Sequence, residues 1–305
     1  MIIRKTQILV KAEVSNGTWN APAVTDGILA YDVVATPEFN MFKRDPHFAD
    51  LSRYQSLSGI QTATITFRTE VRGSGVDALP PAKLQTLLEA SMFASGVGGT
   101  MKPSSTAITT LSIQIEEDGI HKTFVGCGGN VRIVGTVGEP MFFEFSFKGT
   151  IRDITAGALS ALSGLPTTVP PVLLNAAFST NVGGSESHLI NAIEFDMQNE
   201  LALSPDISSA TGVKAAKITG RNPVGSMDPE YNTTYDWLAD IIGNSQGTLT
   251  LTLGSVSQNK IRITAPQIRF LAMDPGDRDG VRILTVPFEM NRSAGNDEIV
   301  FDWDF

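Results

Sequence analysis

The side chains that most often carry catalysis or bind metals are scarce in this sequence. There is one cysteine, Cys127, and there are three histidines, His47, His121 and His188. A zinc site needs Cys and His ligands at short spacings, and neither an H-E-x-x-H nor a C-x-x-C motif occurs. A catalytic triad lacks a candidate nucleophile, because Cys127 has no obvious base beside it and no G-x-S-x-G motif is present. The sequence therefore predicts that the protein is not an enzyme and holds no metal or cofactor.

Two groups of carboxylates are dense enough to be considered as sites. The acidic segment 274–280 lacks the spacing and the closing glutamate of a calcium loop, which favours a solvated hairpin turn. Glu116 and Glu117 are adjacent in a predicted strand, so their side chains point to opposite faces and cannot act as a pair. A hydrolase with paired carboxylates is therefore not indicated.

Strand patterns dominate the chain, so most of the cysteine, histidine and acidic residues named above are expected to lie in strands or in the turns between them. Apolar and polar residues alternate over 62–72, where Ile65 and Phe67 share the apolar face, and again over 141–148. Residues 111–125 predict a hairpin that turns at Asp118-Gly119. Pro80 and Pro81 are followed by leucines at helical spacing, which predicts a helix over about 80–95.

The second half of the chain repeats this order of elements. Ile65 matches Ile218, 153 residues later, and the strand at 111–115 matches 249–253, a separation of 138. Phe145 matches Val286, a separation of 141, and a second helix is expected at about 232–243. We therefore predict a mainly β protein with antiparallel, sandwich-like or barrel-like sheets and one packed helix per domain. The predicted domains are 1–160 and 173–305, joined by a linker rich in Gly, Pro and Thr at 161–172.

Composition limits the classes of function. The 305 residues carry a net charge of -9, which argues against a protein that grips nucleic acid through clustered Lys and Arg. Only 18% of the residues are charged, which suggests that part of the surface is buried in contacts with partners. No run of 18 apolar residues occurs, and the N-terminal segment alternates like a strand. We expect no membrane span and no export signal.

Several segments together resemble a known family. Residues 67–75 lead into the helix that starts at Pro80-Pro81, the hairpin 111–125 is followed by small residues, and Gly138-Glu139-Pro140 precedes a phenylalanine-rich strand. This succession is similar to the major tail tube proteins of siphophages with a duplicated tube domain. The resemblance implies a structural virion protein that assembles into rings, which stack into a hollow tube. DNA and a tape measure protein would pass through this tube, with tail completion proteins as further partners. The implied location is the virion tail, after assembly in the bacterial cytoplasm.

The resemblance also implies a long loop that reaches the next ring, and 41–60 is the best candidate for it. Aromatic residues and Arg are enriched where protein surfaces meet, whereas an ordinary mobile loop has no such requirement. The candidate contact residues of this segment are Phe42, Arg44, Phe48, Arg53 and Tyr54.

An acidic lumen wall would repel phosphate and let DNA slide without specific binding. Glu70, Glu116 and Glu144 lie on polar strand faces and are the candidates for such a wall. If one tube domain is one-sixth of a ring, as the resemblance implies, two fused domains per chain predict a trimeric ring with pseudo-sixfold symmetry, with a hexamer of whole chains as the alternative.

Other classes of protein stay open at this point. A β-sandwich binding or adhesin module of a phage or bacterial surface would need aromatic residues converging on a groove, and the chain has 3 Trp and 4 Tyr. A type VI secretion ring protein or the tube of a contractile tail is disfavoured by the length and the duplication.

Overall fold

Alternating patterns in the sequence become antiparallel strands in the computed structural model, which describes residues 5–47, 49, 52–106 and 109–303. Predicted strand 62–72 lies largely within β4 (Leu57–Glu70), and Ile65 and Phe67 are buried as expected. Phe143, Phe145 and Phe147 are also buried, all in β9 (Phe142–Ala156). The predicted mainly β, antiparallel fold class is confirmed.

The remaining strands of the first half precede or follow these two: β1 (Gln7–Ala12), β2 (Gly27–Ile28), β3 (Tyr31–Phe42), β5 (Phe93–Ser95), β6 (Thr100–Pro103), β7 (Leu111–Glu117) and β8 (Ile120–Thr136). The second half contains β10 (Ala177–Thr180), β11 (Ile190–Asp196), β12 (Asn199–Pro205), β13 (Val213–Arg221), β14 (Val224–Pro229), β15 (Gly247–Leu253), β16 (Ile261–Phe270), β17 (Asp274–Arg278), β18 (Val281–Asn291) and β19 (Val300–Asp302).

In the described part of each half there is one short α-helix, and both are shorter than predicted. α1 (Ala82–Glu89) starts after Pro81 and ends because Met92 adopts a positive φ that turns the chain into β5. α2 (Trp237–Gly243) starts late because Asp236 caps it, accepting a hydrogen bond from the Ala239 amide at 3.0 Å. Residues 232–234 before it form a turn instead of helix.

The strands of the two halves pair in the same order. In the first half the order is β1-β7-β8-β9-β4-β3. In the second half it is β10-β15-β16-β18-β14-β11. Leu111 faces Cys127 and Leu249 faces Ala265, so both strands of this pair repeat with a separation of 138 residues, as the sequence pattern indicated.

One residue match from the sequence pattern is wrong. Ile65 lies opposite Phe147, and the counterpart of Phe147, Phe288, lies opposite Gly225. The structural counterpart of Ile65 is therefore Gly225, not Ile218. Alternation alone cannot detect this difference, because Ile218 belongs to β13, an extra strand pair inserted before the repeat resumes.

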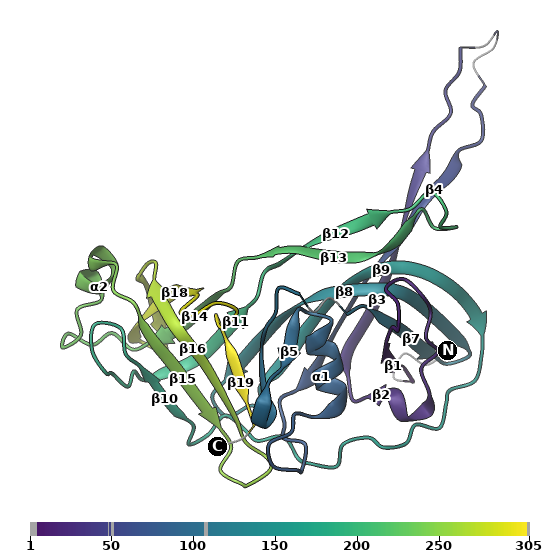
Figure 1. The fold of residues 1–305 in the computed structure, drawn as a ribbon. Coiled ribbons are helices and arrows are strands. Elements are labelled where there is room, and N and C mark those ends of the chain that lie inside the picture. The colour runs from purple at the N-terminus through teal and green to yellow at the C-terminus, as the bar shows by residue number, and fades with distance from the viewer. Residues whose placement is uncertain (1–4, 48, 50–51, 107–108, 304–305) are drawn as a thin grey trace.

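The two halves form one continuous structure. β8 pairs with β11, β6 pairs with β19, and a single cluster of buried apolar side chains includes residues from both halves. The β12–β13 hairpin lies across β8 and β9 of the first half (Figure 1). The predicted linker, 161–172, lies within the segment 157–176, which the structure describes in full and which has neither strand nor helix. This segment is tied to the first half, for example by the hydrogen bond from Arg72 to the Thr168 carbonyl at 3.0 Å.

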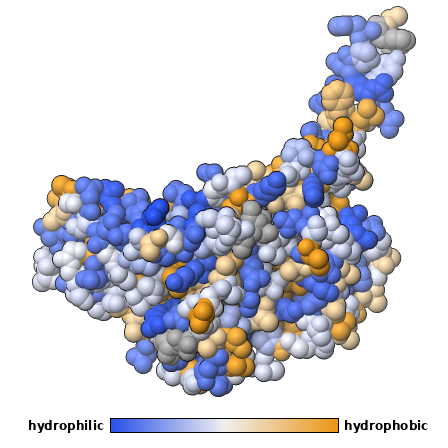
Figure 2. Space-filling model, viewed as in Figure 1, coloured by the Kyte–Doolittle hydropathy of each residue, from blue (hydrophilic) through white to orange (hydrophobic). Residues whose placement is uncertain are grey.

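The distal parts of β3 and β4 form an arm that projects from the body of the molecule (Figure 1). Apolar side chains lie along this arm without other elements covering them (Figure 2).

Candidate assembly surfaces

Eight strands form a ribbon that runs through both halves. Its order is β3-β4-β9-β8 in the first half, then β11-β14-β18-β17 in the second, and the junction is the pairing of β8 with β11. One face of the ribbon packs on the apolar core together with α1. Because side chains alternate between the faces of a strand, the opposite face carries the polar residues.

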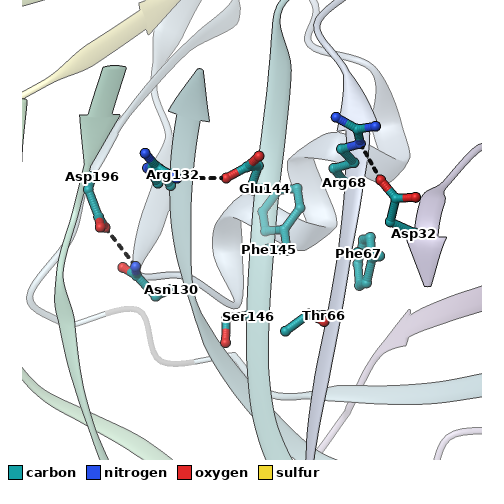
Figure 3. Close-up of a pocket in the computed structure, with 10 residues that line it drawn as sticks. All are labelled: Asp32, Thr66, Phe67, Arg68, Asn130, Arg132, Glu144, Phe145, Ser146 and Asp196. Atoms are coloured by element: carbon teal, nitrogen blue, oxygen red, sulfur yellow. Dashed lines mark hydrogen bonds and ion pairs between the residues drawn. The ribbon is translucent and has the colours of Figure 1, made fainter. Parts of the chain in front are cut away.

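This polar face is hollowed at the junction of the two halves (Figure 3). The hollow has a volume of about 350 Å³ and is lined by Asp32, Thr66, Phe67, Arg68, Asn130, Arg132, Glu144, Phe145, Ser146 and Asp196. Both of its arginines are in ion pairs: Arg68 contacts Asp32 at 2.7 Å, and Arg132 contacts Glu144 at 3.2 Å. These pairs balance charge in the hollow and leave the basic groups neutralised.

Arg132 is held between carboxylates from both halves. It donates hydrogen bonds to Glu144 of β9 and to Glu194 of β11. Partial burial disfavours its charge, but the hydrogen bond to Glu194 and the charges of Glu194, Glu144 and Asp196 outweigh that cost and raise its pKa. The guanidinium therefore stays charged and is neutralised by its carboxylate partners.

The two outer edges of the ribbon are open. Among the described residues, β3 pairs with β4 alone and β17 pairs with β18 alone. β3 is 12 residues long and exposes Val34, Phe39 and Met41. An exposed, long strand edge with apolar side chains is a template for pairing with another chain.

The arm carries most of the candidate contact residues predicted from the sequence. Its tip is shorter than the predicted loop, because 41–42 belong to β3 and 57–60 to β4, which leaves 43–56 between the strands. Phe42 is 67% exposed, and the Arg44 guanidinium lies over the Tyr54 ring at 5.4 Å. Arg53 is exposed, and Phe48 lies outside the described residues. The structure thus brings Arg44 and Tyr54 together on a projecting element.

The three carboxylates predicted to line a lumen differ in their surroundings. Glu144 lies on the polar face beside Arg132. Glu70 is largely buried, and it accepts hydrogen bonds from Arg72 and from the Tyr31 hydroxyl. Glu116 is 0% exposed, so the expectation that it faces a lumen is wrong.

Glu116 instead holds three segments of the first half together. It accepts hydrogen bonds from Gln7, Gln114 and both the amide and hydroxyl of Ser160. Burial raises its pKa, but these hydrogen bonds outweigh burial and lower the pKa below its ordinary value. The sequence pattern missed this role because the segment around Ser160, which has no periodic pattern, covers the polar side of β7.

Comparison with known proteins gives the family of the chain. The family model described as phage tail tube protein matches residues 3–290. The chain belongs to this phage tail tube protein family. A search of curated proteins found no match.

In this member of the tail tube family, Cys127 and His188 both pack against other parts of the protein. Burial raises the pKa of the Cys127 thiol well above its usual value, and the nearby Glu13 carboxylate adds to that effect. Within 5–47, 49, 52–106 and 109–303, no group of three His, Cys, Asp or Glu side chains is arranged to hold a metal ion. His188 packs against Tyr235 and Trp237, and burial lowers its pKa. No helix in the described part of the chain is long and apolar enough to cross a membrane.

Sequence reasoning missed the two open edges and the β12–β13 hairpin. β17 has the sequence DPGDR, which is typical of a turn, so nothing in it indicates a strand edge. The only available signal at β3 was its run of apolar and β-branched residues around Val33 and Val34.

Proposed function

We propose that this chain is the major tail tube subunit of a phage, a structural protein and not an enzyme. Its copies assemble into rings, and the rings stack into a hollow tube through which the genome passes. One observation supports this most strongly: two runs of strands with the same pairing order are already joined head to tail by β8 and β11. A head-to-tail interface that repeats and closes makes a ring. We retain 1–160 and 173–305 as the two tube domains.

A ring of three chains with pseudo-sixfold symmetry fits the ribbon best. Neighbouring strands lie about 4.8 Å apart, so three eight-strand ribbons span a circumference of roughly 115 Å. A closed barrel of eight strands is filled by its own side chains, whereas barrels of 16 or more strands leave an open channel. A single chain therefore cannot enclose a lumen, and three chains can. A ring of six whole chains is the alternative.

The polar face of the ribbon is our candidate for the lumen wall. Its arginines are neutralised: Arg132 pairs with Glu144 and Glu194, and Arg278 pairs with Asp228 and Glu230. With a net charge of -9, the assembled wall repels phosphate more than it attracts it. DNA and a tape measure protein would therefore move along it without specific binding.

The arm formed by β3 and β4 is the candidate for contact with the next ring. It projects away from the ribbon and exposes Phe42 and Tyr54. Tail completion proteins would contact the last ring. The site of action is the virion tail, and assembly takes place in the bacterial cytoplasm.

Negative-stain electron microscopy of the purified protein at high concentration tests this function. We expect rings or hollow tubes with six equal lobes around the axis. A protein that stays monomeric at all concentrations and binds a glycan array would instead support a β-sandwich adhesin module.

A further inference from the structure

We propose that β3 of one copy pairs antiparallel with β17 of the next copy, in the register that β11 and β8 already show inside the chain. This inference rests on the proposed ring, and it names the two edges and the residues that meet. The partner is a second copy of this chain.

The internal junction supplies the template. Glu194 lies opposite Val134, Phe195 opposite Ile133, and Ile193 opposite Gly135. The Val137 amide donates to the Asn191 carbonyl at 2.8 Å, and the Met197 amide donates to the Val131 carbonyl at 3.2 Å. Because hydrogen-bonded pairs alternate along an antiparallel ladder, Glu194 and Val134 form a pair without mutual hydrogen bonds.

β3 takes the same place in the first half that β11 takes in the second, because β3 pairs with β4 and β11 pairs with the corresponding strand, β14. Glu194 lies opposite Ser226 of β14, and Val34 lies opposite Thr66 of β4. Thr66 and Ser226 are themselves counterparts, since Ile65 corresponds to Gly225. Val34 therefore corresponds to Glu194, and Ala35 corresponds to Phe195. Both strands also carry an irregularity within one residue of the same place, between Tyr31 and Val34 and between Ile190 and Ile193.

β17 likewise takes the place of the C-terminal part of β8, because β17 pairs with β18 and that part of β8 pairs with the corresponding strand, β9. Val134 lies opposite Phe142 of β9, and Gly276 lies opposite Ile283 of β18. Phe142 and Ile283 are counterparts, because β9 and β18 repeat with a separation of 141 residues. Gly276 therefore corresponds to Val134, and Pro275 corresponds to Ile133.

The transferred register puts Val34 opposite Gly276 and Ala35 opposite Pro275. Val33 and Ala35 are only partly buried and pack at the margin of the core, so pairing with β17 would cover them. Val34, which is 53% exposed, would be covered on the other face. Pro275 has no amide hydrogen, so this junction lacks one hydrogen bond that Ile133 provides in the internal one. We expect the junction between copies to be weaker than the junction within the chain.

Disulfide trapping tests the register. In the double variant Val34→Cys/Gly276→Cys, the two residues form a pair with about 4.5 Å between Cα atoms, which suits a disulfide. A Cβ on Gly276 would lie 3.2 Å from Cγ1 of Ile283, and its φ is not positive, so a small shift accommodates it. Cys127 is buried and does not compete. Under mild oxidation we expect covalent dimers and a closed covalent trimer on a non-reducing gel.

Matched variants make the result specific. Glu194→Cys/Val134→Cys is the internal counterpart and should give an intrachain disulfide with no change in oligomer size. Val34→Cys/Asp274→Cys moves the partner along the same face by two residues, to a diagonal separation of about 7–8 Å, and should crosslink poorly.

Microscopy of the same samples separates the two proposals. Rings or tubes without a Val34–Gly276 crosslink would overturn the register and leave the function standing. Crosslinked oligomers that never form rings would support the edge pairing and contradict the tube. Absence of both at high concentration would reject the pairing and the tube together.

Discussion

The guanidinium of Arg132 donates a hydrogen bond to the carboxylate of Glu194, 62 residues further along the chain. The two side chains are 42% and 37% exposed. Next to them, Phe195 is completely buried, lies opposite Ile133 and packs edge-on against Phe288. The junction of the two halves therefore places an exposed ion pair beside two buried apolar residues, Phe195 and Ile133, that face each other across it.

We expect the buried Phe195 side chain to contribute more to stability at the junction than the ion pair. Phe195→Ala should lower the free energy of unfolding by about 3–5 kcal/mol, because it removes a buried ring and leaves a cavity. Glu194→Gln should cost at most about 1 kcal/mol, since exposed ion pairs are solvent-screened. Denaturant titrations of both variants measure the difference. Equal losses would mean that the ion pair holds the halves together.

Stability should fall in acid through Glu116. Its pKa is lowered in the folded protein, so its contribution is fully present above the unfolded value of about 4.3 and is lost as the pH falls through the folded pKa. Glu116→Gln presents an amide to amide donors and should cost about 1–3 kcal/mol at neutral pH. It should also flatten the dependence of stability on acidic pH.

Glu117→Gln is the control for this change. Glu117 pairs with Lys122 at the surface and should leave both stability and its pH dependence nearly unchanged. Melting temperatures at a series of pH values distinguish the two variants, and an identical acid dependence in Glu116→Gln and the wild type would refute the role of Glu116.

Gly126 should be essential for the close packing of the β12–β13 hairpin against β8. Its φ is +65°, and a Cβ there would lie 2.8 Å from the Lys214 carbonyl oxygen and from Cα of Ala215. Gly126→Ala should therefore destabilise the protein by more than about 1 kcal/mol. At Gly128 a Cβ would only touch Ala216 at 3.4 Å, so Gly128→Ala should stay within about 0.5 kcal/mol. Unfolding curves of the pair decide the point.

Shortening the arm should separate ring formation from stacking. Replacing 43–56 by Asn-Gly closes β3 and β4 with a tight turn and should leave the melting temperature unchanged. We expect rings that no longer stack into long tubes in electron micrographs. Tubes of normal length would show that the arm is not the contact between rings.

Charge on the polar face should control DNA binding by assembled tubes. Glu144→Lys removes one partner of Arg132 and adds a second cation, so tubes of this variant should retain DNA at low salt and release it as salt rises. Glu117→Lys changes the net charge equally but lies on β7, which is not part of the ribbon. Fluorescence anisotropy of labelled DNA with both tubes measures this, and equal retention would argue against the polar face as the lumen wall.

The sequence alone was sufficient for the class of fold and for strands such as β4, β7, β9 and β15, because a half-buried strand must alternate with period two. It also indicated one helix in each half. The buried faces of Ile65 and Phe67 and of the β9 phenylalanines follow directly from that constraint. The repeat was also visible, since the same constraint acts twice. Only the tertiary structure decided the register of the repeat, the burial of Glu116 and the existence of two open edges at β3 and β17. The register and the open edges depend on which strands are neighbours in the sheet. The burial of Glu116 depends on the position of the irregular segment around Ser160. Contacts between residues far apart in the chain determine both, and periodicity within one segment carries no information about them.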